Sequence, residues 1–182
     1  MKRLTLFLTV LAAVCLAACA RQQQKPQAGK VLVVYFSATG TTEDAARQIA
    51  QVTGADLLPI RPEKPYTAAD LDWNNDASRS SMEMTDAKSR PAIVADSVDL
   101  LAYDTIYLGF PIWWGVAPRV VNTFIESHNL AGKTVIPFAT SGGSGIGAAE
   151  RSLHETYPDV KWGMGRLLNH ATKDEITKWI NS

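Results

Sequence analysis

The sequence has little cysteine and little histidine. Of its 182 residues only two are cysteine, Cys15 and Cys19, and three are histidine. The chain from residue 20 onward therefore has no thiol, which excludes a disulfide, a cysteine nucleophile and a cysteine-based metal site there. No His-x-x-x-His pair occurs either, so we expect no bound metal.

The chain also lacks an excess of charge of either sign. Eighteen Lys and Arg residues balance eighteen Asp and Glu residues. Binding a polyanion requires a basic surface, so we expect no nucleic-acid partner. With 46% hydrophobic residues over 182 positions, the chain can bury one sizeable core, and a single folded domain is predicted.

No apolar run is long enough to predict a membrane span with certainty. A positively charged N-terminus precedes an apolar run over residues 4–18, which is shorter than the roughly 20 residues that a spanning helix needs. The run ends in small residues directly before Cys19, a pattern that resembles a bacterial lipoprotein signal with Cys19 as the lipidated residue. The alternative is an ordinary secretory signal cut near Ala18 or Ala20.

We therefore expect residues 1–18 to be a signal peptide, residues 19–29 a flexible polar tether and residues 30–182 the folded domain. Either kind of signal predicts export. Lipidation at Cys19 predicts a protein anchored by its N-terminal lipid on the periplasmic side of a bacterial cell envelope. Ala20, rather than Asp, after the lipidated residue favours the outer membrane in a cell with two membranes.

The most informative stretch covers residues 30–50, KVLVVYFSATGTTEDAARQIA. Its apolar run over residues 31–36 predicts a strand buried on both faces, as in a parallel sheet. The turn at residues 37–42 is rich in hydroxyl groups and leads into a helix, so it can direct N–H and hydroxyl groups at a phosphate. The turn has no basic residue, which favours a single phosphate over a polyphosphate. The other interpretation is a turn without a ligand.

Further strands are predicted at residues 55–60, 103–110 and 134–139, with a weak last strand at 160–168 that two glycines interrupt. Further helices are predicted at 94–102, after Pro118, at 148–155 and after a capping box at 172–175. Pro137 predicts a local irregularity because it removes a ladder donor. The alternation of strands and helices predicts an α/β fold with a parallel sheet.

Residues 61–91 form a long polar connection in this pattern, which we call the excursion. Thr67–Asp70 could cap a short helix in it. Trp73 and Met82 are expected to pack the excursion against the body of the domain. Long connections are often functional, and a lid or flank over a site is one interpretation. Decoration of the domain is the interpretation that the sequence favours.

Three unusual loops each follow a predicted strand: residues 37–42, 111–115 and 140–147. Ligands bind at the carboxyl ends of strands in open parallel sheets. The second loop carries the adjacent Trp113 and Trp114, of which one should be buried and one available to a flat heteroaromatic ring. The third is glycine-rich, which allows close approach of its backbone. Residues 143–148 also fit the dinucleotide pattern G-x-G-x-x-A, but late in the chain and without the expected acidic partner.

The S-A-T-G-T-T turn, the P-I-W-W-G loop and the glycine-rich loop, in this order and spacing, resemble the flavodoxin family from residue 30 to the C-terminus. The resemblance implies a flavodoxin-like, doubly wound α/β fold with a parallel five-stranded sheet and helices on both faces. It also implies a non-covalent FMN, with the phosphate in the first loop and the ring between the other two. The implied cofactor-binding residues are Ser37, Thr39, Gly40, Thr41, Thr42, Pro111, Ile112, Trp113, Trp114, Gly115, Thr140, Ser141, Gly142, Gly143 and Gly145.

Carrier flavodoxins are acidic around the flavin and usually cytoplasmic, whereas this chain is neutral and carries an export signal. The resemblance therefore implies a distinct branch: an FMN-binding redox protein at the cell envelope, either an electron carrier or an oxidoreductase. Its acceptor would be a protein or a quinone-like molecule, and the sequence identifies neither the donor nor the acceptor. No catalytic side chain is expected, and Trp113 or Trp114 is expected to stack on the flavin.

Two other functions stay open at the level of the sequence. One is a lipid-anchored interaction module that has lost its cofactor. The other is a serine hydrolase, although Ile146 breaks the G-x-S-x-G pattern around Ser144. Its candidate nucleophiles are Ser37, Ser141 and Ser144, and its candidate bases are His128, His154 and His170.

Overall fold

The computed structural model describes residues 29–182. The predicted signal peptide, the tether up to residue 28 and the lipidation site at Cys19 lie outside the described residues. Within the described part, none of the helices combines the length and the apolar character that crossing a membrane requires.

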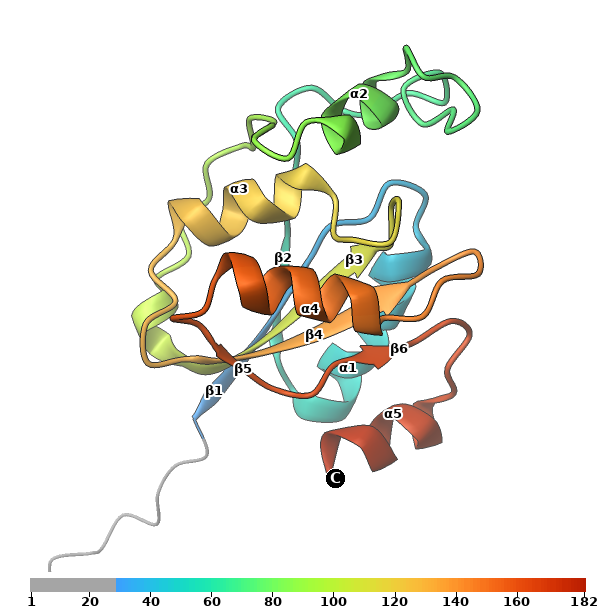
Figure 1. The fold of residues 1–182 in the computed structure, drawn as a ribbon. Coiled ribbons are helices and arrows are strands. Elements are labelled where there is room, and N and C mark those ends of the chain that lie inside the picture. The colour runs from blue at the N-terminus through green and yellow to red at the C-terminus, as the bar shows by residue number, and fades with distance from the viewer. Residues whose placement is uncertain (1–28) are drawn as a thin grey trace, which may run out of the picture.

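A parallel sheet forms the centre of the domain (Figure 1). Its order is β2-β1-β3-β4-β5, and β6 also pairs with β4. The short β5 and β6 are two pieces of one interrupted fifth strand, so the predicted five-stranded sheet is confirmed. The strands are β1 (Lys30–Tyr35), β2 (Asp56–Pro59), β3 (Tyr103–Pro111), β4 (Thr134–Thr140), β5 (Lys161–Trp162) and β6 (Arg166–Leu167).

Helices cover both faces of the sheet, as in a doubly wound fold (Figure 1). The alternation of side chains along β1 explains why: Val33 and Tyr35 pack with α1 and α5, whereas Leu32 and Val34 pack with α3 and α4. Every side chain from Leu32 to Phe36 is buried. The helices are α1 (Thr41–Thr53), α2 (Arg79–Thr85), α3 (Arg119–Ser127), α4 (Gly147–Thr156) and α5 (Lys173–Ile180), with a short 3-10 turn at Leu100–Ala102.

Pro137 lies in a central strand without shifting its register. It pairs with Leu108 of β3 in an unbroken ladder. The carbonyl groups of Val135 and Ala139, two residues to either side, accept hydrogen bonds from Gly163 and Leu168 on the side of the fifth strand. Pro137 therefore turns its missing N–H toward the fifth strand, between the pieces β5 and β6, where no ladder donor is needed.

The predicted helix over residues 94–102 is wrong. Only Leu100–Ala102 turns, as a 3-10 helix whose N-cap Asp99 accepts from the N–H of Leu101. The preceding chain is extended, because Val94 donates to the carbonyl of Arg61 at 2.7 Å and Ile93 bridges Pro62. Pairing with the start of the excursion thus overrides the helical spacing of Val94, Val98 and Leu101.

The excursion is attached to the body by other residues than those predicted. Trp73 and Met82 are 70% and 62% exposed. The ring of Tyr66 instead packs against Phe36 at 5.7 Å between centroids, and Met84 is buried. Thr67 and Asp70 do exchange hydrogen bonds, but around a turn; the one helix of the excursion, α2, is capped by Ser78.

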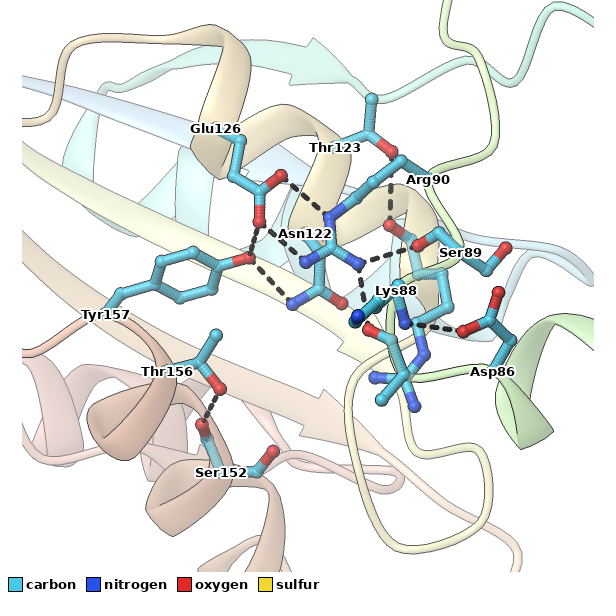
Figure 2. A network of polar contacts seen from close by, with 12 residues as sticks. Asp86, Lys88, Ser89, Arg90, Asn122, Thr123, Glu126, Ser152, Thr156 and Tyr157 are labelled. Carbon is cyan, nitrogen blue, oxygen red and sulfur yellow. Dashed lines mark hydrogen bonds and ion pairs between the residues drawn. The ribbon is translucent and has the colours of Figure 1, made fainter.

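The C-terminal part of the excursion, after α2, is fixed by a polar network (Figure 2). Arg90 forms a bidentate ion pair with Glu126 of α3, with both distances 2.7 Å. Tyr157 donates to the same carboxylate and accepts from Asn122, and Thr123 donates to the carbonyl of Pro91 at 2.9 Å. Both ends of the excursion are therefore attached to the body of the domain. The N-terminal end is held by aromatic packing and the C-terminal end by charge-assisted hydrogen bonds.

Candidate functional site

The three predicted loops converge where β1, β3 and β4 end, at the right-hand edge of the sheet in Figure 1. Together with residues of the excursion and of the segment after β6, they line two adjoining pockets of about 360 and 410 Å³, which share Ala38, Thr39 and the 111–113 segment. We call them the polar pocket and the apolar pocket. The polar pocket is lined in addition by Thr41, Thr42, Thr140, Ser141, Gly142, Asn169 and His170. The apolar pocket is lined in addition by Leu71, Trp73, Ser80 and Trp114.

The start of α1 opens onto the polar pocket. Gly40 precedes the helix with φ 97°, and no side chain of the described part of the chain caps the helix start. The hydroxyl of Ser37 accepts from the N–H of Gly40 at 3.1 Å, which fixes the turn, and Thr39 and Thr41 line the pocket. Free N–H groups at the positive end of a 13-residue helix, beside neutral hydroxyls, make a site for an anion.

One buried hydrogen bond ties the first loop to the third. The hydroxyls of Thr42 and Thr140 lie 2.7 Å apart, and both residues are buried. Thr42 and Thr140 line the polar pocket, but the hydroxyl of each is already hydrogen-bonded to the other. Their bond holds the helix start and the end of β4 at a fixed separation, so the site is formed by the fold itself.

The two tryptophans separate as predicted, one inward and one outward. Trp113 is partly buried, edge-on against Phe36 and Tyr66 at centroid distances of 5.6 and 5.3 Å. Trp114 is 53% exposed, with φ 48°. Trp113 forms the wall between the two pockets, whereas Trp114 lines the apolar one. Gly115 closes this turn with φ 82° and lines neither pocket.

The glycine-rich loop is braced by two polar side chains. The hydroxyl of Ser141 accepts from the N–H groups of Gly143 and Ser144 at 3.1 and 2.7 Å. The amide of Asn169 accepts from the N–H of Ser141 at 2.8 Å and donates to its carbonyl. Gly142 lines the polar pocket, while Gly143 and Gly145 lie beside it without lining it. A Cβ at any of the three glycines would meet open space, so packing within the chain does not require glycine there.

Sequence reasoning missed Asn169 and His170, which line the polar pocket. They directly follow β6, and the carboxyl end of any parallel strand lies at the same edge, so the weak last strand was the available signal. It also did not connect Leu71, Trp73 and Ser80 with the site. All three residues line the apolar pocket, which favours the interpretation of the excursion as a flank over a site.

The serine hydrolase arrangement does not assemble in the described residues. His128 bonds to Ser127 and the carbonyl of Phe124, and His154 stacks on Trp162. His170 lines the polar pocket with Ser141, but the hydroxyl of Ser141 is engaged with the backbone of its own loop. None of the candidate nucleophiles is hydrogen-bonded to a candidate base, which a Ser–His pair requires.

A cluster of interacting polar groups links the two halves of the excursion. The hydroxyl of Tyr66 donates to Glu83, which pairs with Arg79 at 2.6 Å, and the Arg79 guanidinium lies 4.0 Å above the Tyr66 ring. Burial, and then the hydrogen bond to Glu83, raises the pKa of Tyr66 far above its ordinary value. The phenol therefore stays neutral and acts as a donor that holds the excursion in place.

A family model with the description Flavodoxin matches residues 30–182, nearly all of the described chain. The chain belongs to the flavodoxin family. The strand order β2-β1-β3-β4-β5 and the three loops at the carboxyl edge agree with this membership. The flavodoxin-like fold predicted from the sequence is thereby confirmed.

Two solved structures resemble this chain closely in both sequence and fold. A protein from Bacteroides uniformis, provisionally described as a flavoprotein, is 57% identical, with a TM-score of 0.83 over 86% of this chain and 100% of that one. One from Bacteroides eggerthii, described likewise, is 56% identical, with a TM-score of 0.82 over 84% of this chain and 96% of that one. A Lactobacillus acidophilus flavoprotein solved in complex with FMN is 24% identical at a TM-score of 0.69, over 84% of this chain and 99% of that one, and shows the shared fold.

Curated relatives match over a shorter stretch. An FMN-dependent NADH:quinone oxidoreductase from Bacillus cereus is 30% identical over 84 residues, 45% of this chain. A protein of the same description from Bacillus anthracis matches to the same extent. The chain spans about 40% of the length of these relatives. The chain is thus a flavodoxin-like flavoprotein related to FMN-dependent NADH:quinone oxidoreductases.

Proposed function

We propose that this protein is an FMN-dependent oxidoreductase of the cell envelope that passes electrons to a quinone-like acceptor. The observation that carries the proposal is the polar pocket, where an uncapped helix start with neutral hydroxyls meets an aromatic wall and a braced glycine-rich loop. The names of the curated relatives support both the cofactor and the class of acceptor.

The residues of the polar pocket fit FMN. A phosphate monoester needs several N–H and hydroxyl donors and no strongly cationic clamp, and the 39–42 segment offers this set at the positive end of α1. The polar edge of a flavin needs backbone donors and acceptors, which Gly142 can supply because no Cβ intervenes there, whereas the backbone of Ser141 is engaged with Asn169. Trp113 would supply an aromatic face next to the ring.

The chemistry would belong to the cofactor: bound FMN would supply two-electron transfer, in which a hydride from a reduced nicotinamide donor and one proton from solvent convert a quinone to its hydroquinone. The protein contributes position and polarity. The Thr42–Thr140 bond ties the first loop to the third, Asn169 braces the third loop, and Trp113 lines one side of the cleft. No side chain has to act as acid, base or nucleophile.

The envelope part of the proposal comes from the N-terminal sequence. Small residues before Cys19, after a positively charged start and an apolar run, support lipidation and export. Metabolic labelling with a radioactive fatty acid tests it: we expect label in the wild type and none in Cys19→Ser. Label in both variants would contradict the anchor.

The cofactor site is tested by comparing FMN with riboflavin, which lacks the phosphate. We expect the purified protein to retain flavin bands in its absorption spectrum, with flavin fluorescence quenched. Thr41→Ala should weaken FMN binding about tenfold, since a hydrogen bond to a charged group contributes roughly 1.5–3 kcal/mol. It should leave riboflavin binding unchanged, because riboflavin has no phosphate for Thr41 to contact.

Thr53→Ala is the matched control for this experiment. Thr53 lies at the opposite end of α1, and its hydroxyl bonds to the carbonyl of Ile49. We expect it to bind both flavins as the wild type does. A folded protein that takes up no flavin, or a Thr41→Ala variant that loses FMN and riboflavin affinity equally, would contradict the proposed site and favour the interaction module.

A further inference from the structure

The apolar pocket contains features that holding FMN does not explain. Its volume of about 410 Å³ lies within the range of small-molecule sites, roughly 300–1,000 Å³. It adjoins the polar pocket through Ala38, Thr39 and the 111–113 segment. Three of its lining residues, Leu71, Trp73 and Ser80, come from the excursion rather than from the sheet edge.

Two exposed indoles face this pocket. Trp73 is 70% exposed and Trp114 is 53% exposed, and both line it. Large apolar side chains that group on a surface mark a place where something binds. Within residues 29–182, no charged residue lines the pocket, and its polar side chains are the neutral Thr39 and Ser80. The lining therefore suits a flat, neutral and largely apolar molecule, and it offers nothing to a charged one.

The excursion holds its side of the pocket in a fixed position. Ser80 donates its N–H to the carbonyl of Asp70 at 2.9 Å, which fastens the turn that carries Leu71 and Trp73 to α2. Arg119 of α3 donates to the carbonyl of Met84 at 3.2 Å, which fastens α2 to the body. The indole of Trp73 is thus exposed on a braced segment, which lowers the entropic cost of binding against it.

We propose that the apolar pocket binds the electron acceptor, a neutral bicyclic quinone, between the excursion and the 111–114 loop, with Leu71 and Trp73 as its recognition residues. This inference rests on the proposed function, because it assumes FMN in the adjoining polar pocket. It assigns the excursion a role as the acceptor-binding flank of the site. The shared wall at Trp113 explains how an acceptor could lie close to the cofactor.

Binding of menadione to the purified, FMN-loaded and oxidised protein tests the inference without turnover. Equilibrium dialysis should give saturable binding of one menadione per protein. Trp73→Ala and Leu71→Ala should each raise the menadione Kd about three- to tenfold, because each removes one stacking or apolar contact. Trp73→Phe should restore most of the affinity. All three variants should retain FMN, as judged from the absorption spectrum.

Met82→Ala is the matched control. Met82 lies on α2 of the same excursion and is 62% exposed, but it does not line the apolar pocket. It should bind menadione as the wild type does. Circular dichroism of each variant shows whether the fold is intact, which we expect because Trp73 is mostly exposed.

The outcomes separate the two proposals. A wild type that retains no FMN overturns the proposed function. A wild type that retains FMN but binds no menadione, or variants at Trp73 and Leu71 that retain FMN and bind menadione normally, overturns the acceptor pocket alone. If Trp73→Ala slows reduction of added cytochrome c while menadione binding is unchanged, the exposed indoles serve a protein acceptor, and the inference is likewise wrong.

Discussion

At the scale of single residues, Trp113 and Trp114 show how neighbours in the sequence can have unlike roles. Trp113 contacts Phe36 and Tyr66 edge-on, so it joins the excursion to β1 and to the cleft. Trp114 has a left-handed backbone and an exposed indole. Trp113 supports the fold and lines both pockets, whereas Trp114 lines the apolar pocket.

We expect the two alanine variants of this pair to differ in stability. Trp113→Ala should lower the free energy of unfolding by about 2–3 kcal/mol, somewhat below the usual loss for a fully buried tryptophan, because Trp113 is only partly buried. Trp114→Ala should change it by less than about 0.5 kcal/mol. Urea unfolding of the flavin-free protein, followed by circular dichroism, measures both values. Equal losses would show that Trp113 is not the anchor that its contacts indicate.

At the scale of elements, close approach between strands decides where glycine is needed. A Cβ on Gly109 of β3 would lie 2.1 Å from the Phe138 ring of β4. Phe138 is fully buried against α1 and α5, so its ring cannot move away. The glycine therefore gives space to a core ring in the centre of the sheet.

Gly109→Ala should destabilise the protein by about 3 kcal/mol, the upper part of the range for overpacking a core. The double variant Gly109→Ala, Phe138→Leu should recover part of that loss, because the smaller side chain vacates the contested space. Thermal unfolding of both single variants and the double variant gives the coupling. Strictly additive effects would contradict a steric clash between these two positions.

At the scale of the whole molecule, the tyrosines limit the stability of the domain at alkaline pH. The pKa of each of its five tyrosines is raised above the ordinary value. Burial is the main cause for four of them, while a hydrogen bond to Asp56 is the main cause for Tyr103. Burial raises the pKa of Tyr157 to about 12; the hydrogen bond from Asn122 opposes this shift, and the hydrogen bond to Glu126 adds to it.

These shifts predict that stability falls at high pH. A raised native pKa means that the folded protein keeps its phenol protons while the unfolded chain loses them near pH 10. The stabilisation is complete below pH 10 and, for Tyr157, is lost as the pH rises toward about 12. Tyr157 contributes a slope of at most about 1.4 kcal/mol per pH unit over that interval.

Urea unfolding at a series of alkaline pH values measures this slope, and Tyr157→Phe is its control. That variant removes one titrating group, so its unfolding free energy should fall less steeply between pH 10 and 12 than that of the wild type. A free energy of unfolding that is independent of pH over this interval would contradict the assignment of buried, neutral phenols.

Much of the fold and part of the site could be predicted from the sequence, because they depend on residues that are close together in the chain. The run at 31–36, the turn at 37–42 and the capping box before α5 depend on neighbours in the chain, and the structure forms them as predicted. The order of strands and loops also determined the flavodoxin fold and the edge at which the three loops meet.

The tertiary structure alone decided what depends on contacts between distant segments. Val94 is extended rather than helical because it pairs with Arg61, and Pro137 is tolerated because the fifth strand is interrupted opposite it. Asn169 enters the site by bonding to Ser141, 28 residues away. Trp73 reaches the cleft because aromatic and ionic contacts hold the excursion across it. Such contacts leave no periodic pattern in the sequence, so only the folded chain reveals them.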